Sequence, residues 1–282
     1  MSRKTVYYHD PLHDDFAPTN GRIHLKQINA DFPYEHKGPL WNALAFVVYR
    51  MVMTPFLFLY CKLVFGLRIE NRKALRELPD GYFLYGNHTN TLADAFIPTL
   101  LAFPRRANIV TAADTVSIPC LRNIVQMLGA VPLADTIDGT RQFLAALHRR
   151  LERRQPIMIY PEAHIWPYYN GIRPFPDTAF AYPVREQVPA VGAVVVYRQR
   201  KLLRFLRRAS PLLSVIRFIL TTRCRRAAPE RICTGRSTHL CAILLPAATA
   251  MRTSTTSPHR IHNRLRNNRA ARPERWDPAW HI

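Results

Sequence analysis

The sequence has few cysteines, and none of them is spaced as a metal ligand or redox pair. There are five in 282 residues, an odd number, and no two stand at the CxxC spacing typical of zinc and redox sites. Cys61 and Cys120 lie in apolar surroundings. We therefore expect neither a disulfide framework nor a metal site, and we predict a reducing location on the cytoplasmic side.

The amino-terminal segment lacks the apolar core of a secretory signal. Residues 1–16 read MSRKTVYYHDPLHDDF, in which acidic and aromatic side chains are mixed, so no export signal is indicated. Residues 1–37 are polar and aromatic throughout and have no helical period. They predict an irregular polar arm.

Acidic side chains are scarce at the other end of the chain. The formal net charge is +21, and +14 of it comes from residues 201–282, which contain 16 Arg, 1 Lys, 1 Gly and only 3 Asp and Glu. Three interpretations of this basic tail are open. It is a surface for anionic lipid, a nucleic-acid-binding segment without a recognised motif, or a stretch out of frame after a frameshift near residues 199–210, whose composition also fits disorder. The total charge therefore does not indicate a function.

The longest apolar run spans residues 41–67 and approaches the length of a membrane span. Arg50, Pro55 and Lys62 interrupt it, and a proline disfavours one continuous helix. We predict that residues 38–78 form a membrane-associating helical hairpin, with two helices meeting near Pro55 and lying in the interface or in one leaflet. A buried helical hairpin is the alternative.

Residues 79–200 alternate short apolar runs with a helical pattern. Phe143, Leu147 and Leu151 recur every four residues, which predicts an amphipathic helix over 140–154. Continuous apolar runs are typical of parallel strands that are buried on both faces. The strand candidates are 81–87, 108–113, 130–133, 156–162 and 188–197. The alternation predicts an α/β fold, with a central, mostly parallel sheet flanked by helices, in one domain over 79–200.

A histidine follows the first of these strands, where the chain turns into a helix. His88 is followed by three capping candidates, Thr89, Asn90 and Thr91, and by Asp94. Ligands of α/β folds bind at this carboxyl edge of the sheet. A carboxylate in the first helical turn can hold one imidazole nitrogen and leave the other to remove a hydroxyl proton, as acyl transfer requires. A surface histidine near a helix cap is the alternative.

A second polar segment, YPEAHIWPYYN over residues 160–170, follows the strand candidate 156–162. Its carboxylate, Glu162, is expected at the same sheet edge, where it can accept a hydrogen bond from an acceptor hydroxyl or hold a helix end. The aromatic side chains Trp166, Tyr168 and Tyr169 predict either packing or a membrane-interface belt.

These segments together resemble the glycerolipid acyltransferase family of the 1-acylglycerol-3-phosphate (PlsC-like) type. Asn87, His88 and Asp94 match its NH-x4-D motif, and Pro161 and Glu162 match the start of its PEGTR motif. Its second and fourth blocks resemble 129–133 and 188–191. The resemblance covers roughly residues 80–200. It implies transfer of a fatty acyl group from acyl-CoA or acyl-ACP to the hydroxyl of a lysophospholipid, without a cofactor and at the cytoplasmic face of a membrane.

The resemblance also implies roles for single residues. His88 is expected to be the base and Asp94 to orient it, and Asn87, Glu162 and Arg173 are expected to bind substrate. Nucleic acid is not an expected partner.

The sequence departs from the family pattern at three points. Five residues rather than four separate His88 from Asp94, so the loop must bulge by one residue or the helix must begin one residue later. The family's two arginines, which would hold an acceptor phosphate, are missing, with Ile165 at the end of the third motif and no arginine after Pro132. The substitutes considered are Arg173, Arg122 and the pair Arg105 and Arg106. A non-catalytic lipid-binding or degenerate acyltransferase-like protein is therefore the alternative function.

Overall fold

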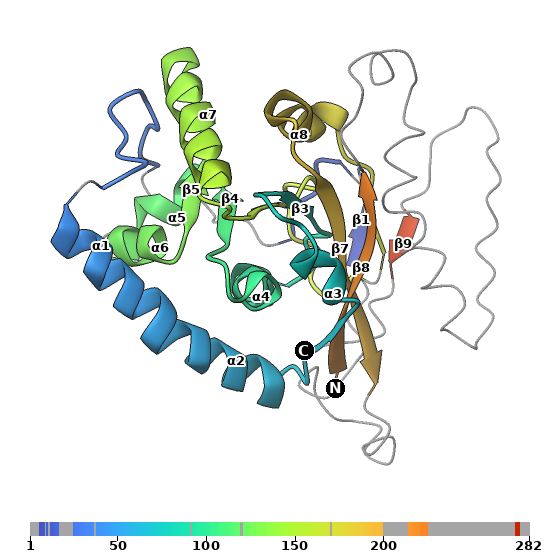
Figure 1. Ribbon diagram of the computed structural model, residues 1–282. Helices are drawn as coiled ribbons and strands as arrows, with labels where there is room; N and C mark the ends of the chain where they lie inside the picture. Colours follow the sequence, from blue (N-terminus) through green and yellow to red (C-terminus); the bar gives the residue numbers. More distant parts are fainter. Residues whose placement is uncertain are drawn as a thin grey trace.

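Five parallel strands form the centre of the fold, in the order β7-β3-β6-β4-β5. The computed structural model describes residues 6–8, 10, 12–16, 25–36, 38–90, 92–118, 121–169, 171–199, 214–224 and 274–276. Each central strand overlaps one of the predicted apolar runs. They are β3 (Phe83–Tyr85), β4 (Asn108–Thr111), β5 (Ala130–Pro132), β6 (Ile157–Ile159) and β7 (Ala190–Gln199). Helices lie on both faces of the sheet (Figure 1), which confirms the α/β class.

Further strands extend the sheet beyond β7. Strand β8 (Ser214–Cys224) pairs antiparallel with β7, and β2 (Arg68–Glu70) pairs parallel with β8. A separate ribbon joins β1 (Val6–Tyr8) to β9 (Glu274–Trp276). Strands β8 and β9 belong to the basic tail. The rest of the tail lies outside the described residues, so its three interpretations stay open.

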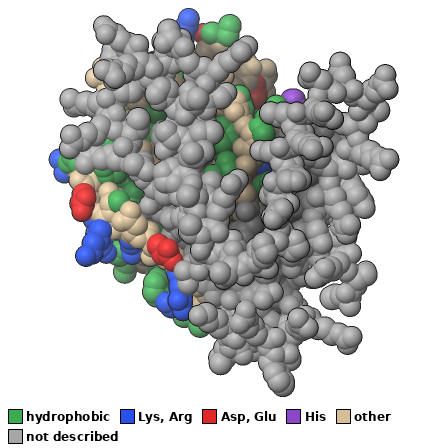
Figure 2. Space-filling view, turned by 90° about the vertical axis from the view of Figure 1, so that its right-hand side faces the viewer, with side chains coloured by type: hydrophobic (Ala, Val, Ile, Leu, Met, Phe, Trp, Pro, Cys, Tyr) green, Lys and Arg blue, Asp and Glu red, His purple; other side chains and the backbone are tan. Residues whose placement is uncertain are grey.

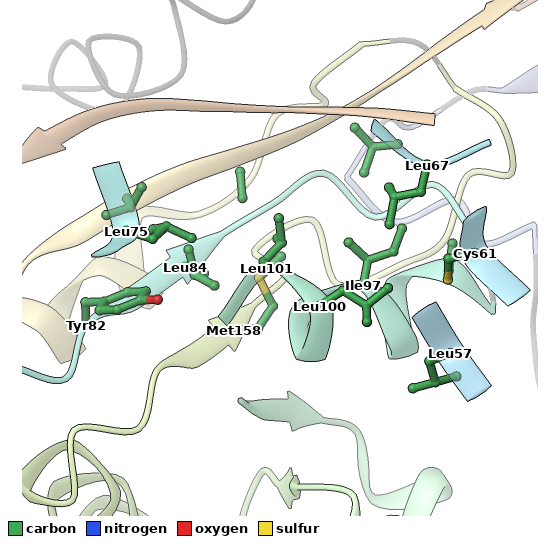
Figure 3. Close-up of a cluster of buried hydrophobic side chains, with 14 of the residues drawn as sticks. Leu57, Cys61, Leu67, Leu75, Tyr82, Leu84, Ile97, Leu100, Leu101 and Met158 are labelled. Carbon is green, nitrogen blue, oxygen red and sulfur yellow. The ribbon is translucent and has the colours of Figure 1, made fainter. Parts of the chain in front are cut away.

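The sheet carries a hydrophobic core on each face, because successive residues of a strand point to opposite sides. Leu84 packs against α4 (Ala93–Ala102) and the short α3 (Lys73–Arg76), as Figure 3 shows. Phe83 and Tyr85 face α7 (Ile137–Glu152), the 3₁₀ turn η2 (Asp177–Phe180) and α8 (Ala181–Glu186). Helices α5 (Ala113–Ser117) and α6 (Leu121–Met127) connect β4 to β5.

A single helix spans Pro39–Leu63, where the sequence predicted a hairpin, so that prediction was wrong. It consists of α1 (Pro39–Phe46), a π-helical stretch η1 (Val47–Met53) and α2 (Thr54–Leu63). Pro55 has no N–H for a helical hydrogen bond. The wider π turns before it shift the pairing by one residue, so that the Thr54 N–H bonds the Tyr49 carbonyl and the helix continues through the proline. We call Pro39–Leu63 the apolar helix.

Part of the amino-terminal arm belongs to the core. Ile28, Phe32 and Tyr34 are at most 7% exposed and pack beside α7. The backbone N–H of Ile28 donates to Asp135 Oδ2 at 2.9 Å, and the Tyr34 hydroxyl donates to the Pro132 carbonyl at 3.0 Å. The arm is irregular as predicted, but it is held against the carboxyl end of β5.

An ion pair that links α7 to α8 predicts a pH-dependent stability. A hydrogen bond from Glu186, 2.7 Å away, and its negative charge raise the pKa of His148 above its ordinary value of 6.5. The contribution of this ion pair to stability is therefore complete below pH 6.5 and is lost as the pH rises through the raised pKa of His148. The melting temperatures of the wild type and a His148→Gln variant should differ at pH 5.5 and converge at pH 9. A difference that grows with pH would contradict this assignment.

Candidate active site

The candidate site lies where β3 and β6 end, side by side, at the carboxyl edge of the sheet. The two strands pair in parallel from Phe83 with Ile157 to Tyr85 with Ile159. The segments that follow them are linked by backbone hydrogen bonds, because the Trp166 N–H donates to the His88 carbonyl at 3.1 Å. The two polar segments of the sequence therefore form one site.

The loop from His88 to Asp94 wraps around a single carboxylate oxygen. Asp94 Oδ2 lies 2.8 Å from His88 Nδ1 and accepts the backbone N–H groups of Thr89 and Asn90 at 2.8 and 2.9 Å. Asp94 itself is 1% exposed. The additional residue in the motif therefore does not separate the pair.

The cap of α4 explains how the longer spacing is accommodated. Asn90 Oδ1 accepts the backbone N–H groups of Leu92 and Ala93 at 3.2 and 2.8 Å, and the Asn90 carbonyl accepts that of Asp94 at 3.0 Å. Asn90, one of the capping candidates in the sequence, thus holds N–H groups at the start of α4. Asp94 lies in the first turn of this helix, beside the imidazole.

The imidazole of His88 is held on one side and accessible on the other. Its ring stacks on that of Tyr160, with centroids 4.6 Å apart, and the Tyr160 hydroxyl donates to the Asp94 carbonyl at 2.6 Å. The side chain is 19% exposed. Within the described part of the chain, no hydrogen bond engages Nε2 of His88. This nitrogen is the one available to take a proton from a substrate.

Glu162 holds the backbone of the His88 loop. Its Oε2 accepts the backbone N–H of His88 at 3.1 Å, and its Oε1 accepts that of Arg173 at 2.9 Å. Arg173 Nε lies 3.2 Å from Oε2, and the exposed fractions of the two side chains are 1% and 0%. Burial raises the pKa of Glu162, and hydrogen bonds and charge from Arg173 oppose this shift. The buried pair therefore holds the backbone of the His88 loop in place.

The arginines considered as phosphate ligands are occupied by protein groups. The Arg173 guanidinium stacks 4.7 Å from the Trp166 ring and also donates to the carbonyls of Glu162 and His164. Arg122 lies over Phe32. Arg105 and Arg106 donate to carbonyls before β3 and at the end of α6. A direct contact between any of them and a substrate phosphate stays a prediction.

Asn87 joins the site to β7. Its Nδ2 donates to the carbonyls of Gly171 and Val195 at 3.1 Å each, and its Oδ1 accepts the Val195 N–H at 2.8 Å. All its polar atoms are thus engaged with the backbone, and the side chain is buried. This arrangement supports a positioning role, and contact with substrate stays a prediction.

Sequence reasoning missed two contributors to the site. Tyr160 stood only as the first residue of the second polar segment, without a sign that its ring meets His88. The acidic segment of the arm was treated as separate, yet the Asp14 carbonyl accepts the Trp166 indole N–H at 2.8 Å and Asp15 lies 3.6 Å from His164. No local pattern signals either contact, because both join distant segments.

Comparisons with known proteins gave a family match and a structural match. Residues 67–196 match the model of the acyltransferase family, a range that includes His88, Asp94, Glu162 and Arg173. The crystal structure of the 1-acyl-sn-glycerophosphate (LPA) acyltransferase, PlsC, from Thermotoga maritima is similar over 78% of this chain and 96% of that chain, at 11% identity and a TM-score of 0.47. No curated protein matches the chain.

Proposed function

We propose that the protein transfers a fatty acyl group from acyl-CoA or acyl-ACP to the hydroxyl of a lysophospholipid of the 1-acylglycerol-3-phosphate type, and the match of residues 67–196 to the model of the acyltransferase family supports this. The observation that carries the proposal is the 2.8 Å contact between His88 Nδ1 and Asp94 Oδ2. It leaves Nε2 open at the sheet edge where ligands of α/β folds bind.

The reaction follows from this geometry. His88 Nε2 removes the proton of the acceptor hydroxyl, and the oxygen attacks the thioester carbonyl carbon. The tetrahedral intermediate collapses by breaking the carbon–sulfur bond, and the imidazolium returns its proton to the departing thiolate. Asp94 keeps the proton of the neutral ring on Nδ1 and stabilises the imidazolium. An ester and a free thiol result, and no covalent enzyme intermediate is needed.

The activity is tested by incubating membranes that contain the protein with a panel of lysolipids and both donor types. Acceptors with and without a phosphate group are included, because the family's phosphate-binding arginines are missing from their usual positions. Transfer to at least one acceptor, dependent on His88, is the expected result. Absence of transfer to every acceptor would favour the non-catalytic, lipid-binding alternative.

Replacement of Asp94 by asparagine keeps the base His88 but removes the carboxylate that orients its ring. The neutral amide would not hold the Nδ1 proton as the carboxylate does, so we expect activity to fall by about 100-fold or more. The ¹⁵N shifts of the two His88 ring nitrogens should report a change of tautomer. Unchanged ring shifts in an inactive variant would mean that Asp94 acts by another route.

The surface of the apolar helix supports membrane association. Ala45, Tyr49, Leu57 and Cys61 pack on the domain, at no more than 4% exposed. The other side of the helix exposes apolar side chains at 46–81%, namely Leu40, Leu44, Phe46, Val47, Met51, Val52, Phe56, Phe58, Leu59 and Leu63. Since buried residues recur from Ala45 to Cys61, we propose that the helix lies in the plane of the membrane, with its exposed side in the lipid.

A pair of charges on this exposed side of the helix should release the protein from membranes. Met51 and Phe58 are 65% and 61% exposed, and transfer of such side chains into lipid contributes about 1.5–3 kcal/mol each. We expect Met51→Asp/Phe58→Asp to weaken binding to neutral vesicles by about 10-fold or more. Leu25→Asp/Ile137→Asp, which alters exposed apolar residues elsewhere, is the matched control. Equal losses in both variants would exclude a specific role of the helix.

A further inference from the structure

Four arginines form a cluster at the carboxyl-terminal end of α7. Arg149, Arg150 and Arg153 come from this end, and Arg106 comes from the loop before β4. Glu35 Oε2 lies 3.0 Å from Arg149 Nε, and its Oε1 lies 3.4 Å from Arg153 Nη1. Among the described residues Glu35 is the one acid paired with these arginines, so the four cations and this carboxylate sum to +3.

Neutral acceptors hold the two inner arginines. Arg150 donates to the Tyr34 carbonyl at 2.8 Å and to Asn108 Oδ1 at 3.0 Å, and Arg106 donates to the Met127 carbonyl at 2.7 Å. These acceptors position the guanidinium groups without neutralising them. Burial, together with the neighbouring cations, lowers the pKa of Arg150 to about 10, so it stays protonated at neutral pH. The positive charge of the cluster is therefore fixed in place.

The cluster adjoins the apolar helix. The ring of His36, next to Glu35 in the chain, stacks on Trp41 of α1 at 3.9 Å, and the Arg106 guanidinium lies 5.3 Å from the ring centre of Tyr49. On the side of the molecule seen in Figure 2, by contrast, basic and acidic side chains alternate along the lower left edge. Positive charge thus lies beside the apolar helix, near Trp41 and Tyr49.

We propose that Arg149 and Arg153 bind the phosphate groups of anionic phospholipids, backed by the charge of Arg106 and Arg150. The two outer side chains are 39% and 60% exposed, and guanidinium groups suit phosphate recognition. Stable peripheral anchoring needs two signals, an apolar insertion and a basic patch. The apolar helix supplies the first and the arginine cluster the second.

Vesicle sedimentation of the full chain tests this proposal. Arg149→Gln/Arg153→Gln should weaken binding to phosphatidylglycerol-containing vesicles by about 10-fold or more and leave binding to phosphatidylcholine vesicles unchanged. Arg141→Gln/Arg185→Gln removes the same charge from exposed arginines elsewhere, 77% and 60% exposed. Equal losses in the two variants, or none in the first, would overturn the proposal. Melting curves of both variants show whether they fold.

A third variant has an expected effect of opposite sign. Glu35→Gln removes the acid of the cluster, so binding to anionic vesicles should strengthen severalfold, whereas a purely structural role of Glu35 predicts no gain. Unchanged or weaker binding by a folded Glu35→Gln protein contradicts lipid docking. A parallel experiment adds inorganic phosphate to the vesicle assay at matched ionic strength. If phosphate abolishes vesicle binding completely, the cluster is a site for free phosphate rather than for lipid.

Acyl transfer in neutral detergent micelles keeps this proposal separate from the proposed function. The Arg149→Gln/Arg153→Gln variant should retain that activity, because neither residue contacts the His88 site. Loss of vesicle binding with full micellar activity supports the lipid site. Failure of the wild type to transfer acyl groups would refute the proposed function and leave the vesicle result intact.

Discussion

Replacement of His88 by alanine is expected to lower acyl transfer by about 10²–10⁴-fold, the contribution of a positioned general base. The residual rate would come from binding and alignment of the two substrates. The fall should appear in the rate at saturating acceptor, because the imidazole acts on the hydroxyl proton in the transition state. The rate of transfer is measured by the free thiol that is released when the thioester of the acyl donor is cleaved.

A histidine outside the site provides the control for this variant. His148 is 58% exposed on α7 and paired with Glu186, so His148→Ala should keep wild-type activity. Full transfer activity in a folded His88→Ala protein would exclude general-base catalysis by this residue. A loss in both variants would point to a fault in folding.

Replacement of Arg173 by methionine should cause the largest loss of stability. The change leaves the Glu162 carboxylate, fully buried at 0% exposed, without its ion-pair partner, which typically costs about 3–5 kcal/mol of unfolding free energy. Burial already raises the pKa of Glu162, and removal of the cation should raise it further. The cost is then complete above the raised pKa and declines as the pH falls and Glu162 takes up a proton.

Chemical denaturation at pH 5 and pH 8 measures this effect. Arg141→Met is the matched control, because Arg141 pairs with Asp138 on the surface, at 77% and 71% exposed, and such pairs contribute about 0–1 kcal/mol. A loss for Arg173→Met no larger than the control, or one that grows toward low pH, would contradict this role of the buried pair. Since Glu162 also accepts the His88 N–H, we expect activity to fall with stability.

The predictions that succeeded rest on local patterns. Apolar runs such as 156–162 form strands because a strand whose two faces are both covered by helices must be apolar at every position. The repeat of Phe143, Leu147 and Leu151 predicted α7 because every fourth residue of a helix returns to one face. The neighbouring positions of the two polar segments followed from the parallel sheet, whose strands all end at one edge.

The failed hairpin prediction shows the limit of the rule that a proline ends a helix. Pro55 predicts a break because it lacks an N–H, but the rule does not include a preceding π stretch that shifts the pairing. The packing of Tyr49 and Leu57 against the domain holds that stretch in one helix. The irregular arm likewise gave no sign that Ile28 and Tyr34 enter the core, since an extended segment has no periodicity to reveal its buried side.

The sequence by itself determined the order of the five central strands, the helix α7, the apolar run over 41–67 and the positions of the polar motifs, because each depends on residues close together along the chain. The tertiary structure decided that the apolar run forms one helix and which side chains meet. It joined Glu162 to Arg173 and to the His88 backbone, stacked Tyr160 on the imidazole and brought Arg149 and Arg153 to Glu35. Such contacts depend on the spatial arrangement of the strands and helices, and chain spacing alone does not encode that arrangement.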